Sequence, residues 1–105
     1  MPDRSEVRRV SMTAHDRLSV DAVVYDDGSL VIEGQDLGPD TPGGDDLEYF
    51  FTIEPADVPL LVAALGGADG ADPLELLEEQ GAAIVMAGEM HWLDQHQVPY
   101  RLRSW

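Results

Sequence analysis

Two short apolar segments, LSVDAVVY (18–25) and LVIEG (30–34), are separated by the turn sequence DDGS and constrain the fold more than any other feature of the chain. Apolar residues occupy alternate positions of the first segment from Leu18 to Val24, with Val23 as the exception on the outer face. This two-residue period is typical of a strand with one buried face, and an Asp-Gly pair between two such segments favours a tight turn. The sequence therefore predicts an antiparallel β-hairpin over residues 18–34.

A third strand is expected at LEYFFTI (47–53), after a stretch rich in Gly, Pro and Asp, DLGPDTPGGDD (36–46). The composition of that stretch is typical of a loop. Alternate positions of the strand share one face, and here they are Leu47, Tyr49, Phe51 and Ile53. The strand is thus predicted to have an aromatic inner side.

A first helix is expected to begin within EPADVP (54–59), although its first residue stays open. Pro55 and Pro59 both suit a first helical turn, but they cannot both be the first residue of one regular helix. Four apolar residues then form a stripe that is expected to lie on the sheet: Leu60, Leu61, Ala64 and Leu65. The pair Gly66-Gly67 is expected to end this helix.

The start of a second helix is specified by DPLE (72–75), which combines an Asp N-cap, a proline at the first helical position and a glutamate three residues after the cap. Leu74 and Leu77 are expected to face inward. Gly81 is expected to break or bend the helix, which AAIVMAGEMHWLDQH then continues to about His96. Gly88 is expected to allow a close approach to a neighbouring element.

The two ends of the chain complete the predicted fold. VPYRLRSW (98–105) is expected to be a strand that begins at a proline, whereas residues 1–14 are polar and aperiodic and are expected to be a disordered tail outside a single domain of residues 15–105. The predicted class is α+β, with a small antiparallel sheet of three N-terminal strands plus a C-terminal strand. Two or three helices are expected to pack on one face of that sheet.

The charges are separated along the chain. All six basic residues are arginines near the ends, and all but three of the 21 acidic residues (Asp3, Glu6 and Asp16) lie within residues 18–100. The middle of the chain is therefore expected to make no salt bridges with itself. A field of one sign attracts basic partners and repels nucleic acid and anionic membranes, although an acidic genomic composition is an alternative cause.

The composition also bears on compartment and cofactors. The chain has no cysteine, which excludes a disulfide framework and a thiolate zinc site, and no apolar run approaches the roughly 20 residues of a membrane span. A cytoplasmic location is therefore expected, with no membrane association and no cofactor.

The segment EMHWLDQH (89–96) concentrates candidate metal ligands: Glu89, His91, Asp94 and His96. On a helix the two histidines diverge by about 140°, which is poor geometry for chelating one ion. Trp92 and Leu93 are interpreted as the buried members, and His96 as a residue of the last turn that bonds a free carbonyl. A metal site or an enzyme centre at these four residues is the alternative.

Two groups of carboxylates are candidate partner-binding residues. They are Asp40, Asp45 and Asp46 in the predicted loop, and Glu75, Glu78 and Glu79 on the second helix. With Glu48, the loop group is also an alternative calcium site, but aspartates in turns usually make Asx-type hydrogen bonds. The favoured function is a non-enzymatic interaction module that presents an acidic surface to a basic partner protein, as immunity proteins, antitoxins and inhibitors do; a DNA mimic is a further alternative.

Four stretches together resemble a group of small acidic actinobacterial proteins that share EYxxTV, LxxALGG and WLxxHxxPY segments. In this chain they are GQDLG (34–38), LEYFFTIEPADVPLLVAALGG (47–67), DPLELL (72–77) and WLDQHQVPYRLRSW (92–105). The resemblance covers roughly residues 18–105. It implies the domain boundary and the order of the elements, and it implies no site.

Overall fold

The computed structural model describes residues 4–15, 18–36 and 47–104. A five-stranded antiparallel sheet has the order β1-β2-β3-β4-β5. Its strands are β1 (Glu6–His15), β2 (Leu18–Tyr25), β3 (Leu30–Asp36), β4 (Leu47–Ile53) and β5 (Arg101–Ser104). A 3-10 turn η1 (Pro55–Asp57) and the helices α1 (Val58–Ala64), α2 (Pro73–Ala87) and α3 (Glu89–Gln95) lie between β4 and β5 in the chain.

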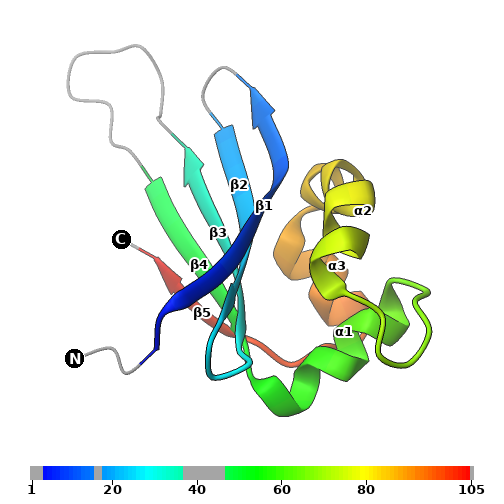
Figure 1. The fold of residues 1–105 in the computed structure, drawn as a ribbon. Coiled ribbons are helices and arrows are strands. Elements are labelled where there is room, and N and C mark those ends of the chain that lie inside the picture. The colour runs from blue at the N-terminus through cyan, green and yellow to red at the C-terminus, as the bar shows by residue number, and fades with distance from the viewer. Residues whose placement is uncertain (1–3, 16–17, 37–46, 105) are drawn as a thin grey trace, which may run out of the picture.

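The predicted α+β class is confirmed, because the helices gather on one side of the antiparallel sheet (Figure 1). The core lies between the two layers. The sheet contributes fully buried side chains such as Val20, Ile32 and Ile53, and the helices contribute Leu77 and Leu93 among others. The opposite face of the sheet has no helix over it in the described part of the chain, so its side chains form their own surface.

The predicted hairpin is confirmed as β2 and β3, which pair from Leu18↔Asp36 to Val24↔Leu30. Across its turn, the Tyr25 N–H donates a hydrogen bond of 3.0 Å to the Ser29 carbonyl. Gly28 lies in this turn and has a positive φ of 89°, which glycine adopts without strain. Val23 points to the open face as expected, but it is completely buried there.

The expectation of a disordered tail at residues 1–14 is wrong from Glu6 onward, because β1 pairs with β2 from Glu6↔Tyr25 to His15↔Leu18. The register shifts twice, between Glu6 and Arg8 and between Ser11 and Thr13. Each shift inserts a residue and interrupts the two-residue period that identifies a strand in a sequence. The sheet therefore has one N-terminal strand more than expected, and Met12 of this strand is 4% exposed in the core.

Two consecutive helical segments explain the paired prolines. Pro55 begins η1, and Pro59 lies in the first turn of α1, so each proline has the position that suits it. The predicted apolar stripe is wrong at Leu60, which is 49% exposed, whereas Leu61 and Leu65 are buried as expected. The helix ends before Gly66, as predicted.

The predicted roles of two glycines are exchanged in the structure. The helix α2 runs without interruption through Gly81, and the break comes at Gly88, whose φ of 92° separates α2 from α3. The predicted start of α2 is confirmed, because the Asp72 side chain accepts a hydrogen bond of 2.9 Å from the Leu74 N–H.

The C-terminal strand is confirmed but begins later than expected, at Arg101. Val98 instead lies in the core at 2% exposure, and its N–H donates to the Leu93 carbonyl at 3.0 Å. This contact brings the chain from the end of α3 to the sheet edge.

Candidate functional site

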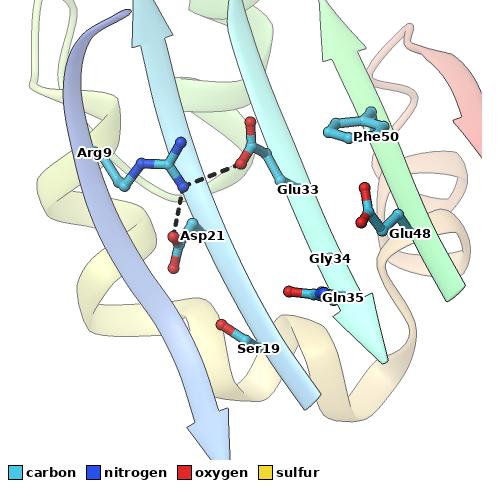
Figure 2. Close-up of a pocket in the computed structure, with 8 residues that line it drawn as sticks. All are labelled: Arg9, Ser19, Asp21, Glu33, Gly34, Gln35, Glu48 and Phe50. Atoms are coloured by element: carbon cyan, nitrogen blue, oxygen red, sulfur yellow. Dashed lines mark hydrogen bonds and ion pairs between the residues drawn. The ribbon is translucent and has the colours of Figure 1, made fainter. Parts of the chain in front are cut away.

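On the open face of the sheet, Arg9 of β1 lies among carboxylates of three strands. Figure 2 shows its contacts with two of them, Asp21 of β2 and Glu33 of β3. Its Nη1 donates to Asp21 Oδ2 at 2.7 Å and to Glu33 Oε1 at 3.0 Å, and its Nη2 donates to Glu6 Oε1 at 2.8 Å. The hydrogen bonds to Glu6 and then Asp21 raise the pKa of the guanidinium, and the Arg9 hydrogen bond lowers the pKa of the Glu6 carboxyl. Arg9 thus offsets part of the negative charge at the centre of this face.

The hollow beside Arg9 is small, with a volume of about 150 Å³. Ser19, Gln35 and Glu48 line it together with the Arg9 group, and Phe50 of β4 lies at its side (Figure 2). Arg9 is already paired with Glu6, Asp21 and Glu33 at this hollow. These ion pairs connect three strands of the sheet, and the sequence prediction missed them because Arg9 was assigned to a tail.

A larger and mostly apolar pocket of about 540 Å³ opens where α3 begins beside β4 and β5. We call it the Tyr49/Glu89 pocket. Its lining side chains come from β4 (Tyr49 and Phe51), from the start of α3 (Glu89, Met90 and His91) and from β5 (Leu102), with Gly88 completing the wall. The volume is in the range of ligand pockets, which is about 300–1,000 Å³.

Glu89 is the polar centre of the Tyr49/Glu89 pocket. Its residue is only 8% exposed, and its Oε2 accepts a short hydrogen bond from the Tyr49 hydroxyl. A buried carboxylate is costly unless it is hydrogen-bonded, so the Tyr49 hydroxyl is a necessary partner. The sequence interpretation named only Trp92 and Leu93 as buried residues of this segment, and it missed the burial of Glu89.

The position of Tyr49 depends on Gly34 in the neighbouring strand β3. A Cβ at Gly34 would lie 2.0 Å from Tyr49 Cζ, so the hydroxyl end of the tyrosine ring occupies the space that a side chain at Gly34 would fill. Phe51 holds the ring from its edge, with centroids 5.6 Å apart at 77°. The predicted aromatic inner side of β4 is confirmed, and these contacts aim the hydroxyl at Glu89.

The four candidate ligands of EMHWLDQH separate in the structure. Glu89 and His91 line one pocket, whereas Asp94 accepts a hydrogen bond of 2.9 Å from the Tyr100 hydroxyl. His96 stacks on Trp92, with ring centroids 4.1 Å apart, and its Nδ1 lies 2.8 Å from the Trp92 carbonyl oxygen. Among the described residues, no three His, Cys, Asp or Glu side chains are grouped closely enough to hold a metal ion.

The interpretation of the two apolar residues in this segment is confirmed in part. Leu93 is fully buried, whereas Trp92 is half-buried and packs against the core from its rim. The His96 ring lies within hydrogen-bond distance of a carbonyl at the end of α3, as predicted, but this Trp92 carbonyl is not free, because it also accepts the backbone N–H of His96.

The candidate partner-binding residues of the second helix are all exposed on α2: Glu75, Glu78 and Glu79. Met86, one of the most exposed apolar residues at 89%, lies on the same helix. The other candidates, Asp40, Asp45 and Asp46, lie outside the described residues, so the alternative calcium site keeps only Glu48 within them.

The N-terminal end of α2 is linked to β1 by an ion pair. Arg8 Nη1 lies 2.5 Å from Asp72 Oδ2, and this hydrogen bond lowers the pKa of the Asp72 carboxyl. A further pair joins Arg101 of β5 to Glu54 at 3.1 Å. In both pairs, a carboxylate of residues 18–100 binds an arginine that lies outside this range, near one end of the chain.

Comparison with known proteins finds no matching family model, no matching curated protein and no matching solved structure. Within the described ranges, no helix has the length and apolar character needed to cross a bilayer.

Proposed function

We propose that this chain is a non-enzymatic interaction module that presents an acidic surface to a basic partner protein, in the manner of immunity proteins, antitoxins and protein inhibitors. The observation that carries the proposal is the outward side of α2, where exposed carboxylates continue into an exposed methionine. We propose a cytoplasmic site of action, and membership in the group of small acidic actinobacterial proteins that the chain resembles.

The geometry of an α-helix places five of the exposed residues of α2 on one stripe. At 100° per residue, these five lie within about 60° on either side of the first. We call them the α2 stripe: Glu75, Glu78, Glu79, Ala82 and Met86. One end of the stripe is anionic and the other is apolar, so a partner segment with basic and apolar residues on one face complements it.

The distribution of charge over the rest of the molecule bears on the proposal that α2 presents the acidic surface. The arginines of β1 are bound to carboxylates, Arg9 on the open face of the sheet and Arg8 at Asp72. Arg8 also lies in the field of Glu75 and Glu78 at the start of the stripe. The net charge of −15 nevertheless leaves most acidic side chains without a cation of their own, which favours a rapid encounter with a basic protein.

Two variants with the same change in net charge test the proposal. The triple variant Glu75→Gln, Glu78→Gln and Glu79→Gln neutralises the α2 stripe. The control triple variant Asp26→Asn, Asp57→Asn and Asp69→Asn removes three charges at other places on the surface. A partner captured from native cell extract is identified, purified, and its association rate is measured with each variant between about 0.05 M and about 0.3 M sodium chloride.

The partner is expected to be basic, and its association with the wild type is expected to slow steeply with salt. The stripe variant should associate more slowly with a flatter salt dependence, whereas the control variant should behave like the wild type. Met86→Ala should increase the dissociation rate, because it removes an apolar contact. An acidic partner, or equal effects of the two triple variants, would contradict the proposal.

A further inference from the structure

We propose that the Tyr49/Glu89 pocket binds a small organic cation, an alkylammonium or arylalkylammonium molecule whose ammonium group pairs with Glu89. The inference is independent of the proposed function, because the pocket and the α2 stripe have different residues. Three features of the pocket carry it: its apolar walls, its buried carboxylate and the fixed position of its aromatic rings.

The walls of the pocket offer apolar surface that remains open to solvent. Met90 is 46% exposed and Leu102 is 44% exposed, although both line a pocket whose inner wall is Phe51. Exposed apolar side chains around a concave site are typical of a surface that a ligand covers. They suit the hydrocarbon part of an amphipathic molecule.

The carboxylate determines the charge of the ligand. An ionised carboxylate can accept about four hydrogen bonds through its two oxygens. The Tyr49 hydroxyl donates one hydrogen bond to Oε2 of Glu89. A neutral hydroxyl offsets only part of the cost of burying a charge, whereas an ammonium group supplies both charge and further donors. An anionic ligand would meet the like charge of Glu89 and is excluded.

The aromatic side of the pocket is held in place before any ligand arrives. The contact of Tyr49 with the Gly34 backbone leaves the ring no room to move toward β3, and Phe51 is fixed in turn by Tyr100 at a centroid distance of 5.4 Å. Fixed side chains lower the entropy lost on binding. The ring faces also attract cations within about 6 Å of their centroids, which adds to the preference for ammonium.

The test compares phenylpropylamine with its neutral isostere phenylpropanol, by NMR titration of the full-length protein in about 0.15 M sodium chloride, which screens the net charge. We expect the amine to shift the backbone signals of Glu89, Met90 and Leu102 and to bind at least about tenfold more tightly than the alcohol, as a charge-assisted hydrogen bond would give. Equal affinities, or amine shifts spread over the acidic surface without a cluster at the pocket, would overturn the proposal.

Two variants separate the charge of the pocket from its apolar wall. Glu89→Gln should bring the affinity for the amine down to that for the alcohol and leave the alcohol almost unchanged. Leu102→Ala should weaken the binding of both probes by a similar factor. Leu60→Ala, at a leucine of similar exposure on α1, should weaken the binding of neither. If Glu89→Gln does not fold, the Leu102→Ala variant still tests the site, because Leu102 is half-exposed. An unchanged affinity of this variant for both probes would refute the site.

Discussion

Gly81, in the middle of α2, lies directly against Met12 of β1: a Cβ atom at Gly81 would be 2.6 Å from the Met12 Cβ and 2.7 Å from its Cα. The close approach of this helix to the first strand therefore depends on the missing side chain. Both residues are buried, so the contact joins the helical layer to the one strand that the sequence pattern did not identify.

Gly81→Ala is expected to destabilise the fold by roughly 1–3 kcal/mol, because the new methyl group must displace the backbone of β1. Helix propensity alone would predict the opposite, a gain of about 1 kcal/mol. Urea denaturation measures the difference, and Ala82→Gly at the exposed neighbouring position reports the propensity term in the same helix. A more stable Gly81→Ala variant would show that helix and strand can separate at little cost.

Met12→Ala should lower the free energy of unfolding by about 2–5 kcal/mol, because Met12 is 4% exposed within the core. The matched control is Met86→Ala, at a methionine that is 89% exposed, where a change within about 0.5 kcal/mol is expected. Thermal and urea denaturation of both variants check this. Equal, small effects would mean that the Met12 side chain contributes little to the core.

Tyr49→Phe should cost about 1–3 kcal/mol, because the buried Glu89 carboxylate loses its hydroxyl donor. Tyr100→Phe removes a hydroxyl that donates to the exposed Asp94, and water can replace that bond, so its cost should be smaller. Chemical denaturation of the two variants gives the comparison. If Tyr100→Phe proved the more damaging change, Glu89 would have another adequate partner.

The ion pair between Arg8 and Asp72 should make part of the stability depend on pH. The hydrogen bond from Arg8 lowers the pKa of Asp72 from its ordinary value of 3.8 in the folded protein, so its contribution is complete above pH 3.8 and is lost as the pH falls through the folded value. Asp72→Asn keeps an N-cap oxygen but removes the charge.

The wild type should therefore be more stable than Asp72→Asn at neutral pH, and the difference should shrink below pH 3.8. Denaturation curves at several pH values between neutral and about 2.5 measure it. Arg8→Gln is the control, since it should remove the part of the pH dependence that comes from the ion pair and keep the part that comes from the Leu74 N–H. A difference that stays constant with pH would show that the charge of Asp72 does not contribute to the stability.

Much of the fold follows from local patterns in the sequence. A two-residue period located β2 and β4, the Asp-Gly turn located β3, and the Asp72-Pro73 start located the first residue of α2. The strand β1 was missed because its two register shifts interrupt the alternation around Met12. The glycine roles were exchanged because a sequence shows that Gly81 lacks a side chain, but it does not show which neighbour needs the space.

The candidate site was predictable only in parts. Glu89 and His91 stood out by residue type, and Tyr49 was placed correctly on the inner side of its strand. The contact between Glu89 and Tyr49, however, depends on the break at Gly88. This break turns α3 so that Glu89 reaches Tyr49, 40 positions earlier in the chain. No local pattern of spacing contains that relationship.

The order of the strands also has a consequence for how the chain folds. Each strand pairs with the next one in the sequence, but the connection between β4 and β5 spans residues 54–100 and includes every described helix. Closing a longer loop costs more entropy, so we expect the first four strands to assemble early and β5 to join last. In the folded protein β5 should also detach first, with its amides exchanging hydrogen faster than those of β3, and each detachment would transiently remove the Leu102 wall of the Tyr49/Glu89 pocket.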